Sequence, residues 1–370
     1  MLIKLDDSLL SHMGALSLDE WSAFDLLGRC HGEGKHLLVV SRNLAKQLAS
    51  CCDCLTPYSA SIYRRIYQSS ATCAFSIVDY PERFILVQKD ENRTEKPSLG
   101  TNSIAMPLKW FGATDKIQSS YLICENLADC DVYTSLAKKY MQKISLRGIN
   151  LSFRPRNGGG QTTERVFEAL LKEHSLVVCI VDSDKSSHNS PLGQTARQVQ
   201  KMYEKLKHDQ SCLVILNARE LENLLPDSVL ESIWPSECSS KASIIRHLSD
   251  SDQGEARLYL DLKAKGLFLC DLLCPIEETP QDLNHIATSG YFPDVHVDCC
   301  AFKICSSEGD CECKLLAPLG ASALSKSIEI IQRSAHFILF QDLCEFHMDE
   351  LERVLRLVIG FGLASPRMSG

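Results

Sequence analysis

The sequence has no long hydrophobic run. Its continuous apolar stretches, such as Val177 to Val181, are far shorter than the ~18 residues that a membrane-spanning helix needs. The first residues also lack the charged segment and following apolar segment of a secretory signal. We therefore expect a chain without a membrane segment, located in the cytoplasm.

An excess of positive charge is also absent. The chain has 39 Lys and Arg residues against 47 Asp and Glu residues, which gives a formal net charge of -8. This charge disfavours a surface coated with phosphate-binding cations, but it allows a nucleic-acid ligand that is held through divalent metal ions and a local basic patch. Internal repeats and low-complexity tracts are lacking too. A length of 370 residues with 45% hydrophobic content indicates about two or three domains with buried cores.

Cysteine, in contrast, is abundant, with 18 residues. A reducing cytoplasm keeps thiols free, so these residues are candidates for core packing or metal binding and not for disulfides. A structural zinc site needs four ligands, usually in closely spaced pairs, and within the stretch 270–313 Cys270 with Cys274 and Cys311 with Cys313 fit that pattern only loosely. Structural zinc is thus one interpretation of the cysteine-rich stretch 270–313, and packing of small apolar side chains is the other.

Four regions are expected along the chain. Residues 1–88 read as a small α/β module that serves recognition or partner docking, with helices at 18–27, 43–50 and 61–68 and strands at 73–78 and 84–88. A charged stretch begins at Lys89, and we assign residues 89–115 to a linker. Residues 116–226 form the central domain. Residues 227–370 form a mixed C-terminal region with amphipathic helices at 328–339 and 348–359.

Strands and helices alternate regularly in the central domain. Apolar runs at 120–124, 148–153, 175–181 and 211–216 predict strands, and the segments 129–142, 163–172 and 194–207 between them predict helices. This alternation is typical of an α/β fold with a doubly wound parallel sheet. Ligands of such sheets bind at the carboxyl ends of the strands, so the residues that follow each strand carry the functional information.

Acidic side chains follow two of these strands. Glu125 and Asp129 come after the first strand, and Asp182 and Asp184 come after the strongly apolar third strand. Carboxylates placed so close together repel one another unless a cation lies between them. Because hard oxygen ligands suit Mg²⁺ or Mn²⁺, the spacing predicts a divalent metal site.

A glycine-rich turn follows the second predicted strand. Gly158 and Gly159 precede a helix, where free backbone amides can hold a phosphate or approach a metal. The turn is no Walker loop, because no Lys-Ser/Thr pair follows it. Arg154 and Arg156 beside it are candidates for phosphate contacts, and solvated loop arginines are the alternative.

The order Glu125, Asp129, glycine turn, Asp182-x-Asp184 resembles the TOPRIM domain of topoisomerases, primases and OLD-family nucleases. Downstream, the stretches Arg219 to Leu225 and Tyr259 to Gly266 are similar to segments of the OLD-like TOPRIM nucleases of bacterial anti-phage defence. The resemblance covers about residues 118 to 266.

This resemblance implies cleavage of DNA or RNA phosphodiesters with two Mg²⁺ or Mn²⁺ ions. It implies that Asp182 and Asp184 bind the first metal, and that Asp129 and Glu222 lie at the second. Glu125 would be a metal ligand or the general base, and Lys263 or Lys265 would steady the charge of the phosphate. Because the chain lacks a Walker motif, a toxic effector of this type would act with a separate ATPase or sensor protein.

The sequence departs from the family pattern at two positions. Asn126 stands where a glycine usually follows the first glutamate, and no glycine occupies the third position after Asp184. The second departure favours the OLD-like nucleases over primases and topoisomerases. A catalytically inactive TOPRIM scaffold that binds nucleic acid or a partner protein is the alternative function.

Overall fold

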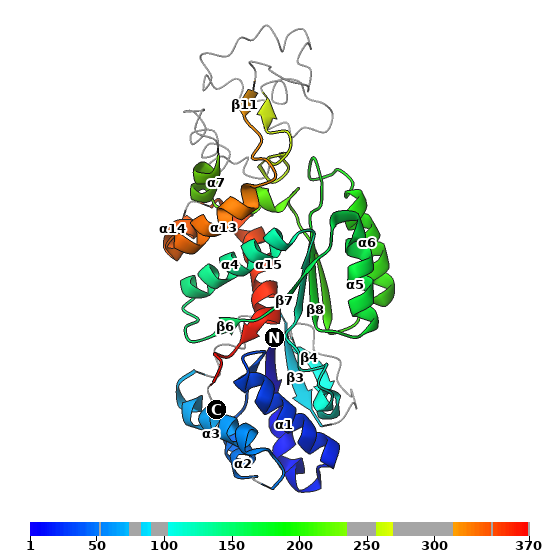
Figure 1. Cartoon of the computed structure of the whole chain (residues 1–370), viewed down its shortest axis with the longest axis vertical. Helices are drawn as coiled ribbons and strands as arrows, with labels where there is room; N and C mark the ends of the chain where they lie inside the picture. The colour runs from blue at the N-terminus through cyan, green and yellow to red at the C-terminus, as the bar shows by residue number, and fades with distance from the viewer. Residues whose placement is uncertain are drawn as a thin grey trace.

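The computed structural model describes residues 1–51, 53–73, 83–89, 103–234, 257–268, 314–341 and 343–368. These residues form two four-stranded sheets whose strands are all parallel, together with two short antiparallel pairs. The predicted α/β class is confirmed. The two large sheets follow each other along the long axis of the molecule (Figure 1). No helix in the described part of the chain is long and apolar enough to cross a membrane.

The first sheet has the strand order β2-β1-β3-β4. Its strands are β1 (Leu2–Leu5), β2 (Leu37–Val39), β3 (Phe84–Gln88) and β4 (Ser103–Pro107). The helices of this module are α1 (Leu18–Gly32), α2 (Arg42–Ser50) and α3 (Pro57–Cys73), with 3-10 turns η1 (Asp7–Ala15) and η3 (Leu108–Gly112). Helix α1 begins at Ser17, whose hydroxyl accepts the N–H of Glu20 while the Glu20 carboxylate accepts the N–H of Ser17.

The N-terminal module extends beyond the boundary that the sequence suggests. Strand β4 pairs with β3 from Ser103 to Pro107, and η3 buries Leu108 and Phe111, although we assigned residues 89–115 to a linker. We did not predict β4, because this strand has only five residues and follows a charged stretch. The strand predicted at 73–78 does not start at its first residue, because Cys73 ends α3. Its other residues lie outside the described part.

The second sheet has the order β7-β5-β8-β9. Its strands are β7 (Arg154–Asn157), β5 (Tyr121–Cys124), β8 (Val177–Val181) and β9 (Ser211–Ile215). Helices α5 (Thr163–Lys172) and α6 (Gln194–Leu206) cover one face, and α4 (Leu127–Lys143) covers the other together with α15 (Glu345–Gly362) (Figure 1). Strand β8 is buried along its whole length, as expected for a strand covered on both faces.

One strand of this sheet differs from the prediction. The apolar segment 148–153 does not enter the parallel sheet, because its short strand β6 (Asn150–Leu151) pairs antiparallel with β12 (Leu363–Ala364). Beside β5, on the side away from β8, the sheet instead contains β7, whose residues we placed after the predicted strand. All four residues of β7 are exposed at the sheet edge, so no apolar pattern marks this strand in the sequence.

The C-terminal region packs onto both modules. It contains α7 (Asp227–Ile233), β10 (Leu267–Phe268), β11 (Lys314–Leu316), α13 (Ala323–Arg333) and α14 (His336–Gln341), so the helix predicted at 328–339 is two helices. Helix α15 buries Leu351, Val354, Leu355 and Val358, and this confirms the second predicted amphipathic helix. Residues 269–313, with their cysteines, lie outside the described residues, as does the zinc site considered there.

Candidate functional site: an acidic crevice at the second sheet

The strand order creates a crevice at the carboxyl ends of β5 and β8. The chain leaves β5 toward β7 on one side and leaves β8 toward β9 on the other, so these two central strands form the switch point of the sheet. Glu125 follows the last residue of β5, and Asp182 follows the last residue of β8. The fold therefore places both predicted residues where doubly wound proteins bind ligands.

Glu125 lies partly buried in this crevice. Its Oε1 atom is fully buried and accepts no hydrogen bond from any described residue. Burial, followed by the negative charges of Asp184 and Asp129, raises the pKa of Glu125 to about 7. Of the predicted acids, Asp129 and Asp184 therefore lie close enough to Glu125 for their charges to affect its pKa.

Asp129 has a structural partner as well as acidic neighbours. Its Oδ2 accepts the N–H of Asn126 at 2.8 Å and so caps the start of α4. Burial raises the pKa of Asp129 to about 6; this hydrogen bond opposes the rise, and the charge of Glu222 adds to it. One oxygen of Asp129 is thus committed to the helix.

Two hydrogen bonds fix the loop that carries Asp182 and Asp184. The Oδ1 of Asp182 accepts the N–H of Leu221 at 3.1 Å, and the N–H of Asp184 donates to the carbonyl of Arg219 at 2.9 Å. Asp184 has a left-handed φ of 53°, and Gly193, without a Cβ, leaves space for its side chain. Burial, then the charge of Glu125, raises the pKa of Asp182 well above its usual range.

The 3-10 turn η5 (Leu221–Leu224) brings a second pair of acids to the crevice. Glu222 is 1% exposed, and neither of its oxygens accepts a hydrogen bond from a described residue, although Lys263 Nζ lies 3.4 Å from Oε1. Glu220 accepts the backbone N–H of Lys263 at 2.9 Å, and burial together with the Glu222 charge raises the pKa of Glu220 to about 7. We did not predict Glu220, although its spacing of two residues from Glu222 repeats the Asp182-x-Asp184 pattern.

Lys263 belongs to the crevice and Lys265 does not. Burial lowers the pKa of Lys263, but the charges of Glu222, Asp182 and Glu220 outweigh burial, so the pKa is raised. Lys265 is exposed, and its backbone N–H donates to Asp261 at 3.3 Å. Of the two predicted lysines, only Lys263 can act on a ligand between the acids.

The glycine turn wraps around Glu125. The N–H of Gly158 donates to the carbonyl of Cys124 at 2.8 Å, and the N–H of Gly159 donates to the carbonyl of Glu125 at 2.9 Å. A Cβ on Gly158 would lie 2.8 Å from the Cys124 oxygen and would also collide with Thr163. A Cβ on Gly160 would lie 4.0 Å from Glu125 Oε2, so the 3-10 turn η4 (Gly160–Thr162), which precedes α5, stands beside this carboxylate.

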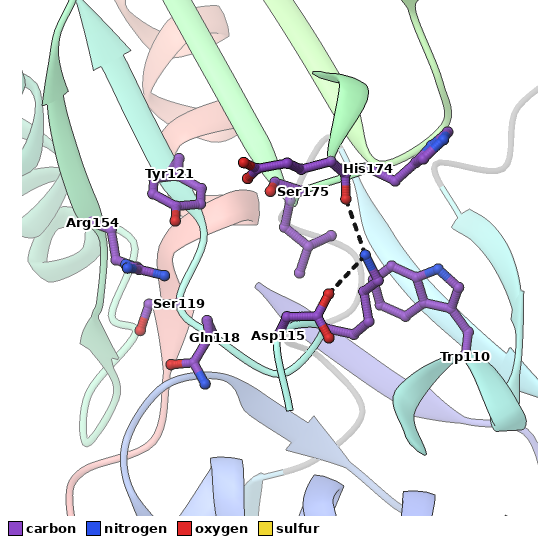
Figure 2. A pocket seen from close by; sticks show the side chains of 11 residues that line it. Trp110, Asp115, Gln118, Ser119, Tyr121, Arg154, His174 and Ser175 are labelled. Carbon is purple, nitrogen blue, oxygen red and sulfur yellow. Dashed lines mark hydrogen bonds and ion pairs between the residues drawn. The ribbon is translucent and has the colours of Figure 1, made fainter. Parts of the chain in front are cut away.

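Arg154 lies away from the acids. It pairs with Tyr121 at the start of β5, and its guanidinium stands 4.7 Å from the centre of the Tyr121 ring. Figure 2 shows both side chains at one side of a cavity of about 280 Å³, with Trp110 at the other side. Arg156 lies 5.3 Å from the same ring and two residues before Gly158, so of the two arginines it is the nearer to the crevice along the strand.

Buried polar atoms without partners gather at this crevice. Besides Glu125 Oε1 and both oxygens of Glu222, the hydroxyl of Tyr133 on α4 has no hydrogen-bond partner among the described residues. Tyr133 has a pKa raised by burial and then by the charge of Asp182, which places its ring near that acid. Each such buried atom costs about 1–3 kcal/mol, so the fold stores free energy that a ligand can recover.

The donor set fits a hard divalent cation. Apart from the Tyr133 hydroxyl, the atoms without a hydrogen-bond partner are carboxylate oxygens, which Mg²⁺ and Mn²⁺ prefer. Burial and then mutual repulsion raise the pKa values of these acids, and a cation among them would stabilise their charged forms. Within the described residues, no group of three or more His, Cys, Asp or Glu side chains stands close enough to form a ready-made metal site. Binding would therefore have to draw the acids closer together.

Comparison with known proteins assigns the chain to no family. No protein-family model matches the chain, and neither a curated protein nor a solved structure is significantly similar to it. The resemblance to TOPRIM domains therefore depends on the residues and the arrangement described above.

Proposed function

We propose that this chain is a metal-dependent nuclease that cleaves the phosphodiester bonds of DNA or RNA. The observation that carries the proposal is the position of Glu125, Asp129, Asp182 and Glu222 around the switch point of a parallel sheet. Oxygens of Glu125 and Glu222 accept no hydrogen bond from a described residue there, and Lys263 lies beside Glu222. Purely structural acids are found paired or solvated, whereas metal-dependent phosphoryl-transfer sites require clustered carboxylates.

Asp182 and Asp184 would hold one divalent cation, and Glu222 with Asp129 would hold a second. Bound there, such cations supply positive charge that stabilises the negative charge developing on the phosphate. Mg²⁺ or Mn²⁺ is expected because every donor is a carboxylate oxygen.

The chain's own groups supply the proton transfer and further charge. With a pKa of about 7, the partly buried Glu125 carboxylate is suited to take a proton from the attacking water. The water oxygen bonds to phosphorus, the bond to the leaving oxygen breaks, and that oxygen takes a proton from solvent. The Lys263 ammonium, 3.4 Å from Glu222, stabilises charge on the phosphate oxygens.

The proposed architecture is a TOPRIM-like catalytic domain of the OLD type. Strand order, the glycine turn beside Glu125 and the Asp182-x-Asp184 loop after β8 support it. By the same resemblance, the chain would be the toxic effector of a cytoplasmic anti-phage system and would act with a separate ATPase or sensor protein. The N-terminal sheet would dock that partner.

A cleavage assay tests the proposal. The purified chain is incubated with supercoiled plasmid, single-stranded DNA and tRNA in Mg²⁺, Mn²⁺ or EDTA, beside Asp182→Asn and Glu125→Gln. We expect cleavage of at least one substrate only with a divalent cation, and a rate at least about 100-fold lower in each variant, because removing one catalytic group typically costs that much.

Asp131→Asn provides the matched control, because Asp131 is an exposed acid on the same helix as Asp129. The control should cleave like the wild type. Cleavage that is equal in all variants would assign the activity to a contaminant and contradict the proposal. Metal-independent binding of nucleic acid without cleavage would instead support the inactive scaffold.

A further inference from the structure

A second cavity lies far from the acidic crevice. It has a volume of about 810 Å³ and is lined by the last turns of α4, the segment 146–152 and the C-terminal tail with Gly34. Helix α4 begins at the crevice and has 17 residues, so at about 1.5 Å per residue its far end is about 25 Å away. In Figure 1 the tail leaves α15 and passes beside β6 toward the N-terminal module.

The charge of this cavity is of one sign. Lys138, Arg147 and Arg367 line it, and none of its described lining residues is an Asp or Glu. None of the three cations forms an ion pair with a described residue. All three side chains are exposed, so an anion from solvent can reach them.

The backbone fixes Arg147 at the cavity. The turn after α4 has left-handed φ values at Ser145 (61°) and Gly148 (73°). Within it, the N–H of Leu146 donates to the carbonyl of Met141 at 2.9 Å, and the N–H of Arg147 donates to Ser145 at 3.0 Å. The arginine therefore projects from a closed turn and not from a free loop.

Backbone hydrogen bonds before and after Arg367 fix the C-terminal tail. The N–H of Ser365 donates to His36 at 3.3 Å, and the N–H of Met368 donates to Gly32 at 2.9 Å. A Cβ on Gly34 would lie 3.0 Å from both the Ser365 oxygen and Arg367 Cγ, so only glycine lets the tail pass this closely. The tail presents its arginine to the cavity in a defined position.

We propose that this cavity binds a small phosphate-bearing ligand of nucleotide size. Cations from three separate segments can surround a phosphate group, and guanidinium groups bind phosphate oxygens in pairs of hydrogen bonds. The volume lies in the range of small-molecule sites, and the rest of the ligand can contact an apolar part of the lining. That part is formed by Met141, Leu146, Ile149 and Leu151. The inference does not depend on the proposed nuclease activity.

Calorimetric titration of the full chain in EDTA tests this site, because EDTA removes any metal-bridged binding at the crevice. The probes are ADP, inorganic pyrophosphate and adenosine. We expect ADP and pyrophosphate to bind, and adenosine to bind at least tenfold more weakly. The double variant Arg147→Gln/Arg367→Gln should weaken ADP binding at least tenfold, and Lys138→Gln alone should weaken it severalfold.

Arg333→Gln is the control, because Arg333 is an exposed cation on α13 that pairs with Glu329. It should bind ADP like the wild type, and so should Asp182→Asn. Adenosine binding as tight as ADP binding, or unchanged ADP binding in both the double variant and Lys138→Gln, would overturn the proposal. Binding of a 5′-phosphorylated oligonucleotide without binding of ADP or pyrophosphate would also overturn it.

Discussion

Asp182 and Glu222 are acids that the fold places next to other acids. Lys263 Nζ lies 3.4 Å from Glu222, and the Lys263 charge also acts on Asp182 and Glu220. One ammonium cannot balance several carboxylates, so among the described residues the crevice keeps unbalanced negative charge. The free energy of unfolding of single-residue variants, measured with and without divalent cations, should reveal the effect of this charge.

Asp182→Asn should stabilise the metal-free protein. The amide oxygen of Asn can still accept the N–H of Leu221, but the side chain carries no charge to be buried beside Glu125. Urea unfolding in EDTA at pH 8 should show a free energy of unfolding about 1–2 kcal/mol above that of the wild type. Asp131→Asn should change it little. A less stable Asp182→Asn protein would contradict the account of the crevice.

His31 predicts a pH dependence of stability. Its Nδ1 accepts the N–H of Leu38 at 3.0 Å, and burial lowers the pKa of His31 to about 4. The unfolded chain, with a His pKa of about 6.5, therefore binds more protons between pH 6.5 and 4. The contribution of His31 is complete above about pH 6.5 and is lost as the pH falls toward 4, by about 3 kcal/mol in total.

His31→Asn checks this prediction, since the Asn side-chain oxygen can accept the same N–H without titrating. The unfolding free energy of this variant should fall less steeply than that of the wild type between pH 6.5 and 4, and His12→Asn should keep the wild-type slope. Parallel slopes for the wild type and His31→Asn would show that His31 is not buried in neutral form.

At the scale of elements, the crevice depends on the glycine turn between β7 and α5. Gly158→Ala introduces a methyl group 2.8 Å from the carbonyl of Cys124, a backbone atom of β5 that has little freedom to move. We expect a loss of about 1–3 kcal/mol in the free energy of unfolding. Because the turn adjoins Glu125, the cleavage rate should also fall at least about tenfold.

Gly14→Ala is the control for this prediction, because nothing lies within 4 Å of a Cβ at Gly14. It should leave both the unfolding free energy and the cleavage rate unchanged. Equal rates for Gly158→Ala and Gly14→Ala would mean that the turn does not position Glu125.

Sequence patterns predict those elements whose residues face a core. Strand β8 and the amphipathic helix α15 are marked by apolar residues, so the acids that follow β8 can be located from the sequence. Strand β7 has four exposed residues, Arg154 to Asn157, and is recognisable only from its pairing with β5. Its register pairs Arg154 with Tyr121 and so places Arg154 at the end of the strands opposite the crevice.

At the scale of the whole molecule, the last residues join the two sheets. Helix α15 covers one face of the second sheet, and its Glu350 accepts the backbone N–H of Asn217 at 2.7 Å and the side-chain amide of Asn217 at 2.9 Å. The terminal ammonium of Met1 donates to Leu363 at 2.8 Å. No local pattern predicts these contacts, because they join residues more than 100 positions apart.

Glu350→Ala should therefore weaken the whole fold. It removes a buried carboxylate that accepts hydrogen bonds from Asn217 and Arg353, each worth about 1.5–3 kcal/mol when a charged group takes part. We expect a lower free energy of unfolding by about 2–4 kcal/mol in urea. Glu345→Ala, at an exposed position of the same helix, should have little effect. Equal values for both variants would show that α15 does not secure the loop after β9.

The central claim is that the crevice binds divalent cations through Asp182 and its acidic neighbours. Titration of the full chain with Mn²⁺, followed by electron paramagnetic resonance of the free ion, measures this directly and needs no substrate. We predict saturable binding to the wild type and to Asp131→Asn, and binding at least tenfold weaker to Asp182→Asn. Equal binding by all three proteins, or no binding by the wild type at millimolar Mn²⁺, would contradict the account.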